Sequence, residues 1–118
     1  MRALRYIALV TLGIAFTIVL LSYAARAETM RASYYGTESG SKTASGERFH
    51  PGGLTAAHRT LPFGTRLRVC YRGCVVVRIS DRGPARWTKR DLDLSQGAAR
   101  VIGMTHVGVA RVSVERMR

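Results

Sequence analysis

The sequence has few acidic residues. Only 7 Asp and Glu accompany 19 Lys and Arg among 118 residues, so the formal charge is +12 at pH 7. An electrostatic field of this sign favours anionic partners such as nucleic acid, lipid headgroups or acidic cell-wall polymers. The basic residues are scattered and do not form a run, so a generic solvated basic surface is the alternative interpretation.

Cysteine and histidine are also scarce, with two and three residues respectively. Two thiolates without a matching histidine pair are too few ligands for a structural zinc ion. The histidines, at positions 50, 58 and 106, are not spaced as a metal-binding set. We therefore expect neither a metal ion nor another cofactor. Internal repeats, low-complexity tracts and linkers are also absent, which predicts a single domain.

The first 27 residues have the layout of a secretory signal peptide. Arg2 and Arg5 precede an uncharged apolar run, Tyr6–Leu21, and Ala25-Arg26-Ala27 supplies small residues for a signal peptidase. The alternative is an uncleaved anchor helix, but this run of about 16 residues is shorter than the ~20 needed to span a bilayer. We predict cleavage after Ala27, export to the periplasm or the exterior, and no stable membrane anchor afterwards.

Residues 28–118 then form the mature domain. Without Arg2, Arg5 and Arg26, 16 basic residues remain against the same 7 acidic ones, a formal charge of +9. Export makes nucleic acid the weakest candidate partner, and we do not expect it. In an oxidising compartment, Cys70 and Cys74 are expected to form a disulfide. Apolar runs flank them and Arg72-Gly73 indicates a turn, so this segment is predicted to be a clipped β-hairpin.

The remaining pattern predicts short strands and one helix. Ser95 is a suitable N-cap for a helix that runs through Ile102 and stops at Gly103. Val75, Val76, Val77 and Ile79 form a near-continuous apolar run, which predicts a strand buried on both faces. Residues 36–53 are expected to form a long functional or mobile loop. Strands are expected at Met30–Tyr35, Leu54–Ala57, Arg66–Tyr71, Cys74–Ser80, Asp91–Leu94 and Val107–Val114. About six strands in so short a domain favour a small closed β-barrel, which leaves no exposed strand edge.

Several segments together resemble the rare lipoprotein A family, in the right order and over nearly the whole mature chain. They are Ala32-Ser33-Tyr34-Tyr35-Gly36, Thr43-Ala44-Ser45-Gly46-Glu47, the stretch from Leu54 to Thr65, Val76 to Pro84, Asp93-Leu94-Ser95 and Val109-Ala110-Arg111-Val112. The resemblance implies an all-β fold, a six-stranded double-psi β-barrel with one short helix. It also implies a peptidoglycan lytic transglycosylase, which cleaves between N-acetylmuramic acid and N-acetylglucosamine and leaves 1,6-anhydromuramyl ends. Its partners would be glycan strands, with amidases acting upstream to strip the stem peptides.

The resemblance assigns the catalytic roles to Asp81, His58 and Glu47, with Asp81 as both general acid and general base, His58 beside it, and His58 and Glu47 in support. A lytic transglycosylase can work with one carboxyl group, because the C6 hydroxyl of the sugar replaces an activated water. The scarcity of acids is compatible with this chemistry, whereas ordinary glycosidases need two carboxylates. The alternative for Asp81 is an ion pair with a neighbouring arginine or a turn cap.

Substrate contacts are expected from Tyr35, Arg59 and Arg82, although a tyrosine in a first strand is as often a core residue. Asp93, just before the helix, is interpreted as a structural acid.

A non-catalytic, expansin-like module that binds wall polysaccharide is the main rival hypothesis, and a secreted inhibitor with the same barrel is a weaker one. The enzyme hypothesis predicts that the Asp81 carboxyl and the His58 ring line one open groove. An Asp81 that is buried and locked to Arg78 or Arg82 would favour binding or a structural role.

Overall fold

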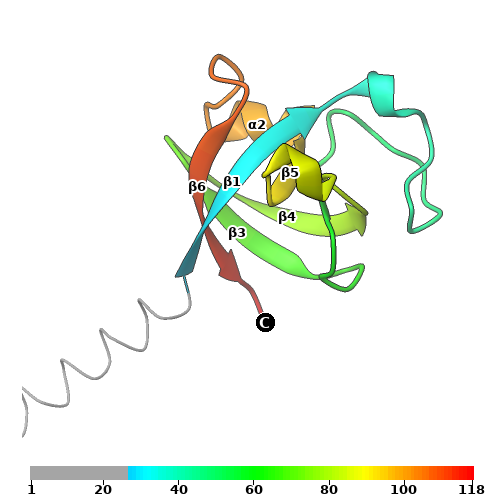
Figure 1. The fold of residues 1–118 in the computed structure, drawn as a ribbon, viewed down its shortest axis with the longest axis horizontal. Coiled ribbons are helices and arrows are strands. Elements are labelled where there is room, and N and C mark those ends of the chain that lie inside the picture. Colours follow the sequence, from blue (N-terminus) through cyan, green and yellow to red (C-terminus); the bar gives the residue numbers. More distant parts are fainter. Residues whose placement is uncertain (1–26) are drawn as a thin grey trace, which may run out of the picture.

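The computed structural model describes residues 27–118, so all of the predicted signal peptide except Ala27 lies outside the described residues. Six strands form a closed barrel in the order β1-β5-β2-β4-β3-β6 (Figure 1). The strands are β1 (Ala27–Tyr35), β2 (Thr55–His58), β3 (Arg66–Cys70), β4 (Cys74–Asp81), β5 (Leu92–Ser95) and β6 (Ala110–Arg116). One short helix, α2 (Gln96–Val101), and two 3₁₀ turns, η1 (Thr37–Ser39) and η2 (Arg86–Thr88), complete the secondary structure. Within residues 27–118, no helix is long and apolar enough to cross a membrane.

The barrel combines parallel and antiparallel pairs. β1 runs parallel to β5 and β2 runs parallel to β4, whereas the other four neighbouring pairs are antiparallel. The predicted six-stranded barrel with one helix is therefore confirmed. The last strand begins at Ala110 and not at Val107, because Gly108 adopts a left-handed backbone (φ 71°) and a turn occupies residues 107–109.

The barrel interior holds one continuous apolar core, and β4 contributes to it from a single face. Val75, Val77 and Ile79 are buried, while Val76 is half-buried and Arg78 is exposed. The prediction that this strand is buried on both faces is wrong, because alternate residues of a barrel strand point away from the interior. The other main contributors are Leu67, Val69, Leu92, Leu94, Ile102, Met104, Val112 and Val114.

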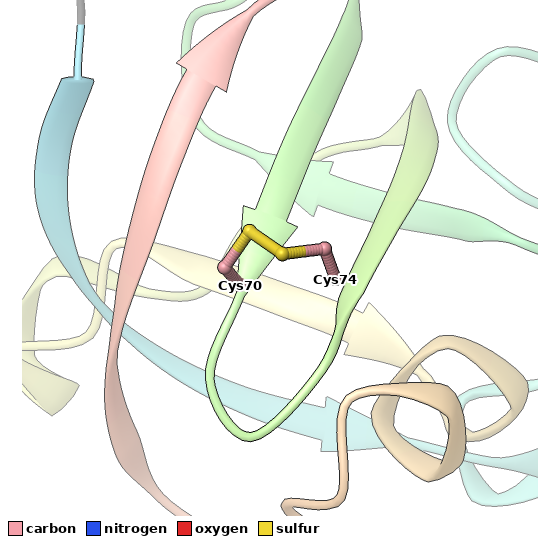
Figure 2. Close-up of a disulfide and its surroundings, with 2 residues drawn as sticks. All are labelled: Cys70 and Cys74. Carbon is pink, nitrogen blue, oxygen red and sulfur yellow. A yellow bond between two sulfur atoms is a disulfide. The ribbon is translucent and has the colours of Figure 1, made fainter.

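The predicted hairpin and its disulfide are confirmed. Cys70 and Cys74 are paired residues of β3 and β4, their Cα atoms are 4.1 Å apart, and their sulfurs are bonded (Figure 2). Figure 2 shows the bond crossing the hairpin just before its tip. Asp81 ends the same strand seven residues later, which at ~3.3 Å per residue places it roughly 23 Å from Cys74. The disulfide therefore clips the end of the barrel remote from Asp81.

The N-terminus of α2 fixes the end of the long loop that follows β1. Ser95 caps the helix as predicted, since its hydroxyl accepts from Ala98 N at 3.3 Å. The same hydroxyl donates to the Gly53 carbonyl at 2.6 Å, and Gly97 N donates to the Pro51 carbonyl at 2.8 Å. Residues 36–53 leave the barrel at the end of β1 and return to it at this point (Figure 1).

Candidate functional site

Two carboxylates stand on one row of the barrel wall. Ala57 of β2 pairs with Asp81 of β4 on one side and with Asp93 of β5 on the other, and Asp93 pairs in turn with Ser33 of β1. Directly paired residues project from the same face of a sheet. Asp81 and Asp93 are two strand spacings apart, roughly 9.6 Å between Cα atoms at ~4.8 Å per spacing.

A bulge in β4 puts Asp81 on this row. Ala56 pairs with Ile79 but Ala57 pairs with Asp81, so Ser80 is the extra residue. Ile79 points into the core, and strict alternation would send Asp81 in the same direction. A β-bulge re-aims the side chain that follows it, so Asp81 faces away from the barrel interior.

The long loop packs against Ala57, in the middle of the row. Tyr35, Phe49 and Ala57 form a second apolar cluster, separate from the barrel core. The rings of Tyr35 and Phe49 stack with centroids 4.8 Å apart, and Tyr35 is only 7% exposed. Phe49 therefore covers one face of the Tyr35 ring, which we had expected to contact a sugar. Substrate binding by Tyr35 stays a prediction.

The hydroxyl of Tyr35 is buried close to the carboxylates of the row. Burial, followed by the charges of Asp81 and Asp93, raises the pKa of Tyr35 well above its ordinary value. The buried hydroxyl makes no well-aligned hydrogen bond within residues 27–118, although Asp81 is close enough to contribute to that pKa. A protonated phenol thus lies among the carboxylates and is able to donate to one of them or to a bound sugar.

Asp81 is held by backbone groups. Its Oδ1 accepts from Ala44 N and from Arg82 N, each at 2.9 Å. The first bond ties the carboxylate to the long loop, and the second fixes it against its own turn. The side chain is half-buried, so it is oriented without being sealed from solvent.

Asp93 occupies a different environment. Its Oδ1 accepts from the Ser33 hydroxyl at 2.9 Å. Burial is the largest influence and raises the pKa of the carboxyl above its ordinary value, while the Ser33 bond and Arg90 oppose that shift and the Asp81 charge adds to it. A carboxyl with a raised pKa retains its proton closer to neutral pH, as a general acid must. The sequence-based prediction gave Asp93 a structural role. An acid placed between two leucines, both of which are buried in the structure, is the feature that could have indicated a carboxyl with a raised pKa.

Glu47 pairs with Arg78 in a two-pronged ion pair, with both N–O distances 2.9 Å. The Arg78 side chain lowers the pKa of Glu47, so this carboxylate is ionised at neutral pH. The pair also means that Arg78 is directed to Glu47 and not to Asp81. An ion pair between Arg78 and Asp81, which would have favoured a binding or structural role for Asp81, is therefore not formed.

The pair borders a cleft of about 180 Å³. Ser80 and Thr55 are among the residues that line it, and their buried hydroxyls have no hydrogen-bond partner in the described part of the chain. Such a cleft has room for about six waters at ~30 Å³ each. His50 is exposed and also lines this cleft.

His58 does not join the row. It follows Ala57 in β2 and therefore points to the opposite face, where it lines a cavity of about 210 Å³ with Leu67 and Val114. Its Nδ1 accepts from Thr60 N and Leu61 N, both at 3.1 Å. Burial, and then Arg59, lower the pKa of His58, so the ring is neutral. The structure thus gives His58 a turn-positioning contact. The expectation that the His58 ring and the Asp81 carboxyl line one groove is wrong, because the two side chains lie on opposite faces of the barrel wall. The catalytic role of His58 stays a prediction.

The guanidinium groups of Arg59 and Arg82 also make internal contacts. Arg59 Nη1 donates to the Pro84 and Arg90 carbonyls at 3.1 and 2.5 Å, and its Nη2 lies 3.5 Å from Asp91. Arg82 Nη1 donates to the carbonyls of His58 and Leu61 at 3.3 and 2.8 Å. Its guanidinium lies 3.9 Å above the Phe63 ring. Arg82, like Arg78, is directed away from the Asp81 carboxylate, and substrate binding by either Arg59 or Arg82 stays a prediction.

Within residues 27–118, no group of three or more His, Cys, Asp or Glu side chains is arranged to hold a metal ion. The two carboxyl groups of the row are able to exchange protons with a bound molecule.

Gly97 allows the close approach of the long loop to α2, and this gives a test of the covering loop. A Cβ at position 97 would lie 2.5 Å from the Gly52 carbonyl oxygen, whereas a Cβ at position 52 would meet nothing within 4 Å. We expect Gly97→Ala to lower the free energy of unfolding by about 1–3 kcal/mol, as overpacking does, despite alanine's higher helix propensity. Thermal unfolding measures this, with Gly52→Ala as the matched control; equal stability of the two variants would contradict the contact.

A closed six-stranded barrel with two parallel pairs and an acid-bearing row outside its core defines a double-psi β-barrel protein with a candidate acid–base site. The chain belongs to the lytic transglycolase family, whose sequence model matches residues 27–114.

Curated relatives agree with this assignment. The chain is 56% identical over 91 residues to the "Probable endolytic peptidoglycan transglycosylase RlpA" of Nostoc sp., an alignment that covers 71% of this chain and 24% of the relative. It is 46% identical over 88 residues to the "Endolytic peptidoglycan transglycosylase RlpA" of Pseudomonas aeruginosa, covering 71% and 26%. The chain thus spans about a quarter of the length of these relatives.

Solved structures share the fold. The Streptomyces papain inhibitor superposes with a TM-score of 0.63 at 21% identity, covering 78% of this chain and 94% of the inhibitor. An expansin from Clavibacter michiganensis has the same TM-score at 23% identity, covering 78% and 50%.

Proposed function

We propose that the chain is a peptidoglycan lytic transglycosylase that cleaves between N-acetylmuramic acid and N-acetylglucosamine and leaves 1,6-anhydromuramyl ends. The names of the curated relatives supply the reaction class and the substrate. The observation that carries the proposal is the row on which Asp81 and Asp93 flank Ala57 in different environments. Two carboxyl groups whose environments differ are suited to opposite roles in one proton-transfer reaction.

In this proposal Asp93 is the acid. Its carboxyl donates a proton to the glycosidic oxygen as the bond from that oxygen to C1 of the muramyl residue breaks. Positive charge develops on the muramyl ring, and the carboxylates of the site stabilise it. Burial raises the pKa of Asp93, which makes its proton more available for this step than that of an ordinary aspartic acid.

Asp81 is the base. The C6 hydroxyl of the same muramyl residue attacks C1 and closes the 1,6-anhydro ring, while its proton passes to the Asp81 carboxylate. Asp81 ends the cycle protonated and Asp93 ionised, and exchange with solvent restores both. This assignment divides between two residues the task that sequence reasoning gave to Asp81 alone.

We further propose that the substrate is glycan from which amidases have removed the stem peptides, in the periplasm or at the cell exterior. Each muramyl lactyl group then carries a free carboxylate. These charges match the +9 formal charge of residues 28–118, which is 16 basic against 7 acidic residues. The match is electrostatic complementarity, which favours association most strongly at low ionic strength.

The rival hypothesis is an expansin-like module that grips the same polymer without cutting it. The two are separated by incubating the purified protein with intact and with amidase-stripped sacculi, followed by mass spectrometry. We expect anhydromuramyl products, in greater yield from stripped sacculi. Sedimentation of the protein with sacculi and no anhydromuramyl product from either preparation would leave the binding module as the function.

A further inference from the structure

The loop between Asp81 and Leu92 connects the strands of the two carboxylates and carries the only tryptophan of the chain. Trp87 lies in η2 and is 84% exposed, the most exposed large hydrophobic side chain among residues 27–118. Tryptophan is highly buried on average in folded proteins. An indole left in water on the loop that joins the two acid-bearing strands is therefore a candidate contact surface for a ligand.

The loop that presents Trp87 is braced on both sides. Thr88 Oγ1 donates to the Ala85 carbonyl at 2.6 Å, and Lys89 N donates to the Arg86 carbonyl at 3.1 Å. Arg59 bonds the carbonyls of both loop arms, Pro84 and Arg90. A braced loop loses little conformational entropy when a ligand binds, which favours affinity.

The charge of the loop is positive around the indole. Arg86 and Lys89 flank Trp87 and are both exposed. The acid at the end of the loop, Asp91, is already engaged, because it pairs with Arg59 and accepts from Arg31 N at 2.9 Å. The ligand that complements this surface has an apolar face to lie on an indole and an anionic group beside it.

We propose that Trp87, with Arg86 and Lys89, forms a second sugar-binding position that holds an anionic glycan strand next to the catalytic row. The C–H face of a pyranose ring stacks on the indole, and the lactyl carboxylate of a muramyl residue pairs with Arg86 or Lys89. The identity of the glycan rests on the proposed function; the stacking position rests on the exposed indole, its braced loop and its cations.

An anionic membrane surface is the competing occupant, since tryptophan and basic residues also gather at lipid interfaces. Two observations favour the glycan. The loop is continuous with Asp81, where a bound strand would already lie. Residues 82–91 offer no second large apolar side chain, whereas a segment that inserts into a membrane needs an extended apolar face.

Because Trp87 is the only tryptophan, intrinsic fluorescence reports on this position directly. The Asp81→Asn chain, which is expected to cut its ligand about 10²–10⁴-fold more slowly, is titrated with amidase-stripped glycan strands and, separately, with vesicles of anionic phospholipid. We expect the strands to shift the emission to shorter wavelength and to protect the indole from acrylamide, and the vesicles to do neither. An unchanged emission while the protein sediments with sacculi, or a shift with vesicles alone, would overturn the proposal.

A second arm uses the active chain. Truncating a buried tryptophan at an interface typically costs about tenfold or more in affinity, so Trp87→Ala should raise KM for stripped glycan by about tenfold with kcat retained. The matched control is Tyr71→Ala, which removes another exposed aromatic ring, 38% exposed at the disulfide hairpin. Equal KM values for the two variants would reject the binding position. A fluorescence response to the strands, without anhydromuramyl products from the active chain, would reject the proposed activity and leave the position intact.

Discussion

Asparagine in place of Asp81 should slow the release of anhydromuramyl products by about 10²–10⁴-fold, the usual contribution of one general acid or base. Asparagine keeps the size of the side chain, and its Oδ1 can still accept from Ala44 N and Arg82 N, the two bonds that hold Asp81. It has no carboxylate to take the proton of the C6 hydroxyl. The loss should therefore appear in kcat, with folding and sedimentation with sacculi retained.

The control for Asp81→Asn is Glu115→Gln, which neutralises a partly buried acid on β6, outside the acid-bearing row. It should cleave at the rate of the unmodified protein. A folded Asp81→Asn variant that cleaves as fast as Glu115→Gln would remove Asp81 from the reaction and leave Asp93 and Glu47 as the acids to consider.

Asp93→Asn should produce a loss of similar size, about 10²–10⁴-fold, because the variant has no proton to give to the leaving oxygen. It should also change the pH profile. Burial raises the pKa of Asp93, so activity of the unmodified protein should fall as pH rises through that pKa. The residual activity of Asp93→Asn should lack this decline, and initial rates measured across pH test both statements.

Stability gives an independent check on Asp93. A carboxyl whose folded pKa is raised above its unfolded pKa stabilises the fold below the unfolded pKa, and this contribution is lost as pH rises through the folded pKa. At neutral pH the variant should therefore be at least as stable as the unmodified protein, and the difference should shrink in acid. Cleavage by Asp93→Asn at the unmodified rate would return both proton transfers to Asp81.

Local patterns in the sequence predicted much of the fold, because they depend on neighbouring residues. The alternation of apolar residues marked the strands, and Ser95 followed by Gly103 marked the helix limits, all within short windows of chain. Cys70 and Cys74 lie on either side of one turn, so their pairing needed no distant contact. The burial of β4 was misjudged because composition alone does not say which face of an apolar strand meets the interior.

The arrangement of the site is a different matter. The sequence by itself determined that the acids are few, that Asp81 ends an apolar strand and that Asp93 stands between two leucines. Only the tertiary structure decided that both acids share a row. Their strands are not hydrogen-bonded to each other, and β2 joins them through Ala57. The bulge at Ser80 reverses the direction of Asp81, while His58, one residue from Ala57, is carried to the other face. Strand pairing and bulges arise from contacts between distant segments, and these set the direction and the burial of each carboxyl group.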